Sequence, residues 1–164
     1  MPKRIATIAV VLWSILVISA GASQTPPVSS EIDRGIWSVF TATVANEDIV
    51  GMGRVYFPEA VLVTPKGTTP IKQTLERWGR DMAAAKARGD KATVEFRFSL
   101  RQDDSTTAFE AGLFKYTVIT KAGVSTPQFV PFEVLLVKSN GAWRVLMERQ
   151  FAAVAQADWD KLAK

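Results

Sequence analysis

The stretch VPFEVLLVKSNGAWRVLMERQF, residues 130–151, decides the fold of this 164-residue chain. It reads as two apolar strands joined by Asn140-Gly141, a pair that accepts the positive φ angles of a two-residue hairpin turn. The facing pairs that this turn predicts are Lys138 with Trp143, Leu136 with Val145, Val134 with Met147, and Phe132 with Arg149. One face of the hairpin is then almost wholly apolar and requires a cover of helices.

Three amphipathic segments upstream of the hairpin supply that cover. Each begins at a residue that suits a helix N-cap or ends at a residue that breaks a helix. The expected bounds are Ser29 or Ser30 to residue 46, residues 49–57 before Pro58, and Thr69-Pro70 to Gly89.

The apolar period changes to two at Lys91, where Val94, Phe96, Phe98 and Leu100 alternate with polar residues. This alternation predicts a strand with one buried face. Further strands are expected over residues 60–64, 107–120, 129–138 and the end of the hairpin. Helices followed by a four-strand meander define an α+β domain, with N-terminal helices packed on one face of a curved antiparallel sheet.

The first residues have the three parts of a secretory signal. Lys3-Arg4 precede an apolar run over residues 5–18, and Ala20-Gly21-Ala22 then offers a cleavage site. Residues 1–22 are therefore predicted to be removed after Ala22, which gives a secreted or periplasmic protein with no stable membrane association. The alternative is an uncleaved membrane anchor. After cleavage, residues 23–29 form a flexible leader, 30–152 one domain, and 153–164 a C-terminal helix or tail.

Composition excludes several function classes. The formal net charge of +4 falls to +2 without the two basic residues of the signal, and no basic run remains, so we expect no nucleic-acid partner. Cysteine and histidine are absent, and no metal-ligand cluster, phosphate loop or activated nucleophile is visible. We therefore expect no metal and no cofactor.

Four short segments resemble one protein superfamily. They are residues 57–62 with Pro65-x-Gly67, residues 71–78, residues 107–112, and residues 140–145. In this order they are similar to the nuclear-transport-factor-2-like (NTF2-like) superfamily, and within it to SnoaL-like and DUF4440 proteins. The resemblance covers residues 30–151. It implies a cone-shaped sheet of the cystatin-like roll type, a mainly apolar pocket between helices and sheet, and often a homodimer formed through the sheet.

Glu110 is the first candidate for chemistry. If the preceding loop is Asp103-Asp104-Ser105, Glu110 lies opposite Phe98 and on the inward face of its strand. A poorly solvated carboxylate suits proton transfer or the binding of a polar ligand group. A register one residue different would instead place Glu110 in solvent and Lys115 inside.

Arg149 and the glutamates near it are the second candidates. The hairpin register puts Arg149 on the apolar face, where it meets a carboxylate or an anionic ligand, or else reaches water at the rim. The same register places Glu133 and Glu148 opposite each other on the outer face. Like charges so placed repel, so we expect both to be exposed; the alternative is a β-bulge that moves one of them into the pocket.

Aromatic residues complete the expected site. Trp37, Tyr56 and Trp78 are predicted at the pocket mouth, with the Tyr56 phenol as a donor; the alternative for Trp78 is an ordinary core position. The predicted ligand-binding residues are Trp37, Tyr56, Trp78, Phe98, Glu110, Phe114 and Arg149.

These residues predict an exported domain that binds a small, mostly apolar ligand. One alternative is a SnoaL-like isomerase, cyclase or dehydratase, with Glu110 as its acid-base group and Tyr56 as the only ready partner. Another is a dimeric interaction module whose outer sheet face and Trp159 tail bind a partner protein. A homodimer is expected because Leu135, Val137 and Leu146 lie on the face that the helices leave open.

Overall fold

The computed structural model describes residues 27–162, so the predicted signal and cleavage site lie outside the described residues. Its elements are α1 (Val28–Ile32), the π-helical η1 (Asp33–Trp37), α2 (Ser38–Asn46), α3 (Ile49–Gly53), β1 (Tyr56–Thr64), β2 (Gly67–Pro70), α4 (Ile71–Arg88), β3 (Lys91–Asp103), β4 (Thr107–Ile119), β5 (Ser125–Ser139), β6 (Ala142–Gln150) and α5 (Gln156–Asp160). The six strands form one sheet in the order β2-β1-β6-β5-β4-β3. The α+β fold class is confirmed.

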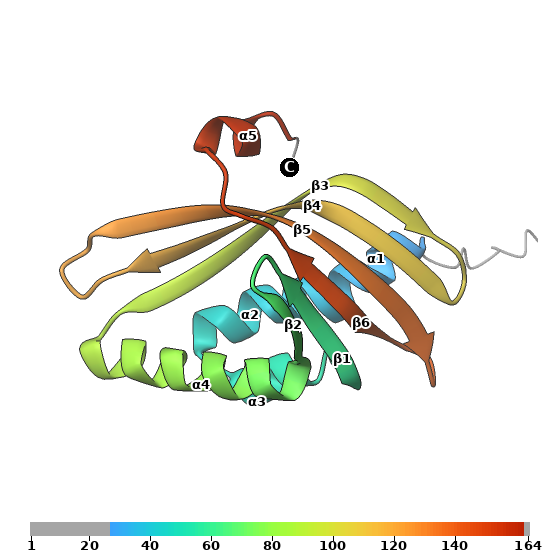
Figure 1. Cartoon of the computed structure of the whole chain (residues 1–164), viewed down its shortest axis with the longest axis horizontal. Helices are drawn as coiled ribbons and strands as arrows, with labels where there is room; N and C mark the ends of the chain where they lie inside the picture. The colour runs from blue at the N-terminus through green and yellow to red at the C-terminus, as the bar shows by residue number, and fades with distance from the viewer. Residues whose placement is uncertain (1–26, 163–164) are drawn as a thin grey trace, which may run out of the picture.

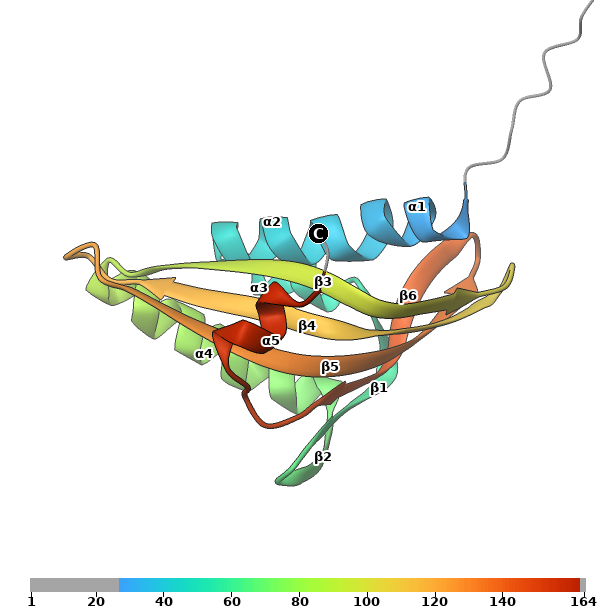
Figure 2. The ribbon, with the colours of Figure 1, turned by 90° about the horizontal axis from the view of Figure 1, so that it is seen from above.

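The helices and the sheet form two layers. α1, η1 and α2 continue one another beneath the curved sheet, and α4 runs beside them, whereas α5 lies on the opposite face (Figure 1). Seen from above, α5 crosses over β4 and β5 (Figure 2). Within residues 27–162, no helix is long and apolar enough to cross a membrane.

Several predicted boundaries are wrong by a few residues. The first helix begins at Val28, and no side chain caps its N-terminus. The second helix ends at Gly53 rather than at Phe57, because Tyr56 and Phe57 start β1, whose pairing with β6 is the one parallel contact of the sheet. Pro58 is tolerated in β1 because it lies where that pairing is irregular.

The core lies between the helices and the concave face of the sheet. Trp37 is its centre: its ring lies 4.7 Å from Phe96, 5.3 Å from Phe98 and 5.4 Å from Phe132, measured between centroids. Such aromatic pairs bury large areas of apolar surface and hold the η1–α2 helix against β3 and β5.

The β5–β6 hairpin follows the predicted register only near its turn. Asn140 and Gly141 have φ angles of 51° and 77°, and Lys138 faces Trp143 as expected. The register then shifts between Leu135 and Leu136, because Leu146 is an extra residue in β6. Beyond this bulge, the predicted pairs of Val134 with Met147 and Phe132 with Arg149 are wrong. Val134 faces Glu148 and Phe132 faces Gln150.

A second bulge lies between β3 and β4. Phe98 pairs with Gly112, but Leu100 pairs with Ala111, so Ser99 is the extra residue. Gly112 permits this approach, since a Cβ there would lie 2.0 Å from the Arg97 carbonyl oxygen. The bulge reverses the alternation of β3: Leu100, expected inside, is 39% exposed.

The C-terminal segment packs on the outer face of the sheet. Trp159 of α5 is buried against Leu113 and Phe129, and the Arg97 guanidinium lies 4.3 Å from the centre of its ring. Arg97 also donates to the Trp159 carbonyl at 2.8 Å. α5 therefore covers a part of the outer face away from Leu135, Val137 and Leu146, which stay partly exposed.

Candidate ligand-binding site

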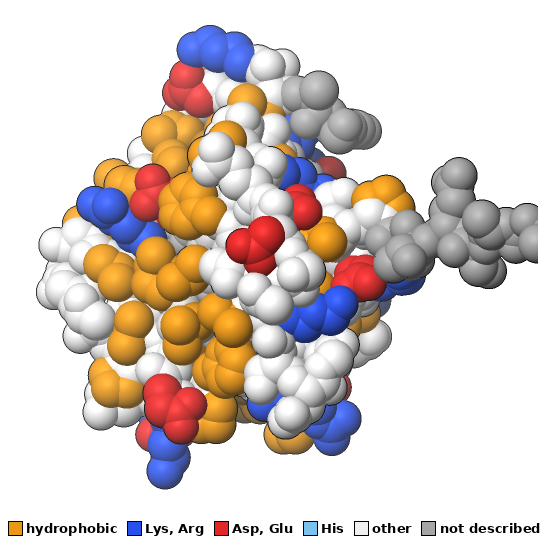
Figure 3. Space-filling view, turned by 90° about the vertical axis from the view of Figure 1, so that its right-hand side faces the viewer, with side chains coloured by type: hydrophobic (Ala, Val, Ile, Leu, Met, Phe, Trp, Pro, Cys, Tyr) orange, Lys and Arg blue, Asp and Glu red, His pale blue; other side chains and the backbone are white. Residues whose placement is uncertain are grey.

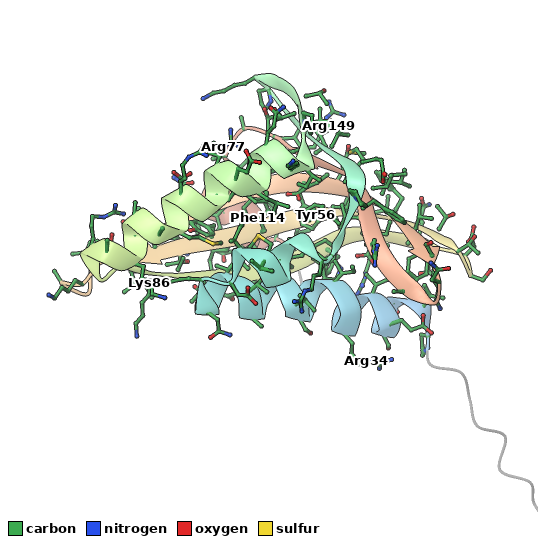
Figure 4. All side chains as sticks on the ribbon, turned by 90° about the horizontal axis from the view of Figure 1, so that it is seen from below. Arg34, Tyr56, Arg77, Lys86, Phe114 and Arg149 are labelled. Carbon is green, nitrogen blue, oxygen red and sulfur yellow. The ribbon has the colours of Figure 1, made fainter. Side chains whose placement is uncertain are left out.

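A cavity of about 480 Å³ opens between α2, α3 and α4 and the concave face of the sheet. The side chains that line it are mostly apolar, and the larger of these are Phe40, Met52, Trp78, Met82, Phe96, Phe114 and Tyr116. They come chiefly from the apolar stripe of α4 and from the inward positions of β3 and β4, two patterns visible in the sequence. Figure 4 shows Phe114 and Tyr56 in the interior, between α4 and the α1–α2 layer.

Glu148 is a buried carboxylate of this cavity. Glu148 is 8% exposed, and it lies on the cavity wall because the bulge at Leu146 turns its side chain inward. The Tyr56 hydroxyl donates to Oε2 at 2.5 Å, and Gln150 Nε2 donates to Oε1 at 2.6 Å. The expectation that Glu148 is exposed is therefore wrong, and the bulge alternative holds.

Burial sets the protonation of this pair. It raises the pKa of Glu148 from its ordinary value, against the two hydrogen bonds that favour the charged form. The pKa of Tyr56 is also raised, first by burial and then by the nearby Glu148 carboxylate. A proton is therefore held more readily here than in water, so Glu148 can accept a hydrogen bond from a ligand or, when protonated, donate one.

Glu110 points inward, as predicted, but it is not part of the cavity wall. It is 1% exposed; Trp37 Nε1 donates to Oε2 at 2.6 Å, and Arg101 Nε donates to Oε1 at 2.8 Å. Arg101 also reaches Asp33 at 2.7 Å. Because the Ser99 bulge places Arg101 opposite Glu110, the predicted pairing with Phe98 is wrong.

This arrangement links elements far apart in the sequence. Burial raises the pKa of Glu110, while the Arg101 guanidinium acts against that rise. Both carboxylate oxygens are used inside the protein, and the resulting ion pair joins η1 to β3 and β4. Glu110 therefore stabilises the packing of these elements, and the structure does not support its predicted role in ligand binding.

The other predicted residues divide into two groups. Trp78 and Phe114 line the cavity, whereas Tyr56 lies behind Glu148, and Trp37 and Phe98 belong to the core beside Glu110. Arg149 was expected on the apolar face and is instead on the outer one, where its side chain is 50% exposed and lies 3.6 Å from Glu133. The same bulge that turns Glu148 inward turns Arg149 outward.

Further charged groups line the cavity. Asp90 is paired with Arg88 at 2.8 Å, and Glu47 with Lys86 at 3.1 Å. Asp81 also lines the cavity, and its charge adds to burial in raising the pKa of Tyr116. In the part of the chain that the structure describes, no group of His, Cys, Asp and Glu could hold a metal ion.

Sequence reasoning missed most of the polar wall. The one signal for Glu148 was the repulsive pairing with Glu133 that an unbroken register would create. Gln150 had no signal of its own, because its inward position follows only from the bulge earlier in the same strand.

Comparison with known proteins identifies the fold. No protein-family model and no curated protein matches the sequence. Among solved structures, Aln2 from a Streptomyces species is 15% identical, with 77% of this chain and 91% of that chain covered and a TM-score of 0.65. An NTF2-like superfamily protein from Salmonella enterica is 17% identical, with 77% and 90% covered and a TM-score of 0.59.

A ketosteroid isomerase-like protein from Erwinia carotovora atroseptica is 18% identical, with 77% of this chain and 95% of that chain covered and a TM-score of 0.53. At these identities the likeness concerns the fold alone. The chain has the NTF2-like fold, also described as cystatin-like, which the sequence resemblance predicted. The narrower likeness to SnoaL-like and DUF4440 proteins stays a prediction.

Proposed function

We propose that this chain is an exported domain that binds a small, mostly apolar molecule in the cavity beneath the sheet. The observation that carries the proposal is a buried carboxylate, Glu148, which no ion pair of the described residues includes, on a wall whose other side chains are mainly apolar. Ligand pockets typically combine a large apolar lining with a few placed polar groups, and a volume near 480 Å³ is in their usual range of roughly 300–1,000 Å³.

A cavity-filling substitution tests this proposal. Ala85 lines the cavity from α4, whereas its neighbour Ala84 is exposed and outside the lining. Ala85→Trp should narrow the cavity and lower the affinity for the neutral probe 1-naphthaleneethanol at least tenfold, while Ala84→Trp should leave it unchanged. Calorimetric titration measures both. Equal affinities in the two variants, or no binding to the parent protein, would contradict the proposal.

A second candidate function is proton transfer in the same cavity. The raised pKa of Glu148 favours it, because a carboxylate of raised pKa exchanges protons more readily near neutral pH. In this reading Glu148, rather than Glu110, is the acid-base residue. The protein should then catalyse exchange of the α-hydrogens of a bound ketone such as 1-(2-naphthyl)propan-2-one with deuterium, and Glu148→Gln should abolish that exchange. Exchange at the uncatalysed rate would exclude it.

A further inference from the structure

The cavity lining is acidic. Among described residues, it contains Glu47, Asp81, Asp90 and Glu148, against one basic side chain, Arg88. Arg88 lies 2.8 Å from Asp90, and Glu47 is paired with Lys86 outside the lining. None of the ion pairs formed within residues 27–162 includes Glu148 or Asp81. Of these two carboxylates Asp81 is exposed to solvent, so Glu148 is the buried carboxylate of the cavity that no cation of the described chain neutralises.

The Glu148 carboxylate has no charged hydrogen-bond partner among the described residues. Its hydrogen-bond partners, Tyr56 and Gln150, are neutral donors, each bound to one oxygen. A carboxylate has about four acceptor positions, so two donors leave room for a third group from the cavity. Burying a charge without a counterion is unfavourable, and a cation bound from the cavity would relieve that cost.

The walls around Glu148 suit a cation as well as a hydrocarbon. Trp78, Phe96, Phe114 and Tyr116 line the cavity, and aromatic faces attract ammonium groups as well as alkyl chains. A neutral or anionic ligand would gain the apolar contacts, but it would leave the buried Glu148 carboxylate without a counter-charge.

We infer that the cavity takes an amphipathic organic cation, an amine whose ammonium group meets Glu148 while its hydrocarbon part packs among the aromatic side chains. This inference rests on the proposed function and names the class of its ligand. It distinguishes the site from a general apolar pocket, because affinity must depend on the charge of the ligand and on one carboxylate.

Three probes of similar size separate charge from shape: the amine 2-(1-naphthyl)ethylamine, the alcohol 1-naphthaleneethanol and the carboxylate 1-naphthaleneacetate. Calorimetric titration at neutral pH should give an affinity for the amine at least tenfold higher than for the alcohol, with the carboxylate weakest. Glu148→Gln should remove at least tenfold of the amine affinity and leave that of the alcohol within twofold. Glu76→Gln, which changes an exposed carboxylate of α4 outside the lining, is the matched control and should change the amine affinity less than threefold.

These measurements distinguish a failure of the inference from a failure of the proposed function on which it rests. If the alcohol or the carboxylate binds as tightly as the amine, or if the amine keeps its advantage in Glu148→Gln, the inference is wrong while the apolar pocket stands. If none of the three probes binds the parent protein, the proposed function fails with it.

Discussion

Replacing Arg101 with methionine removes one half of the buried ion pair that joins η1 to the sheet. Arg101 Nε lies 2.8 Å from Glu110 Oε1, and the two side chains are 24% and 1% exposed. At an effective dielectric constant of about 20, unit charges this close attract by about 6 kcal/mol. The lost attraction is offset in part, because the arginine no longer needs to be desolvated, and methionine keeps the apolar stem.

We therefore expect Arg101→Met to lower the free energy of unfolding by about 3 kcal/mol at pH 7, within the range for breaking a buried pair. The destabilisation caused by Arg101→Met should become smaller as the pH is lowered. Without Arg101 the folded-state pKa of Glu110, already raised by burial, rises further. The cost of burying the charged Glu110 is therefore fully present above that folded-state pKa and absent below the unfolded-state pKa, where the carboxyl is protonated in both states. Adding Glu110→Gln should recover most of the loss at neutral pH.

Urea unfolding followed by tryptophan fluorescence at pH 7 and pH 4 measures these differences. The matched control is Lys115→Met, which breaks the more exposed Lys115–Glu95 pair across the same two strands and should cost about 1 kcal/mol or less. A loss below about 1 kcal/mol in Arg101→Met, or a loss independent of pH and of Glu110→Gln, would refute the reasoning.

Three further predictions concern the cavity, the outer face and export. Glu148→Gln should raise the free energy of unfolding by about 1 kcal/mol at pH 8, since it removes a buried charge. Because the pKa of Glu148 is raised in the fold above its ordinary value of 4.5, this gain should vanish at pH 4, and urea unfolding at the two pH values would show it. The outer face carries the partly buried Leu135. Hydrophobic side chains also gather on the side of the molecule shown in Figure 3. We propose a homodimer through the outer sheet face: light scattering should give twice the mass of the mature chain, and Leu135→Glu should give the monomer mass, whereas a monomeric parent protein would exclude the dimer. We also propose that export removes residues 1–22. The intact mass of the secreted protein should then match a chain that begins at Ser23, and a membrane-bound species that keeps Met1 would contradict the proposal.

The sequence predicted the fold because its signals are local and periodic. The Asn140-Gly141 turn, the stripe of α4 and the alternation in β3 each depend on residues close together in the chain. Because these signals agree, they were enough to predict the α+β class and to predict which residues near each turn face the core.

The site was predicted less well because two bulges lie between those turns and the polar residues. An extra residue at Leu146 exchanges the faces of Glu148 and Arg149, and one at Ser99 brings Arg101 inside opposite Glu110. A bulge depends on how neighbouring strands curve and pack, which the alternation of one strand does not reveal. Sequence patterns therefore predicted Trp78 and Phe114 on the cavity wall, while the choice of its carboxylate required the three-dimensional register.

Fluorine NMR of the protein labelled with 5-fluorotryptophan tests the central claim, the location of the ligand site, most directly. Trp78 lines the cavity, whereas Trp159 is buried on the outer face against Phe129. Titration with 1-naphthaleneethanol should shift the Trp78 resonance in proportion to occupancy and leave that of Trp159 in place. A titration that shifts Trp159 and leaves Trp78 unchanged would place binding on the outer face and contradict the account.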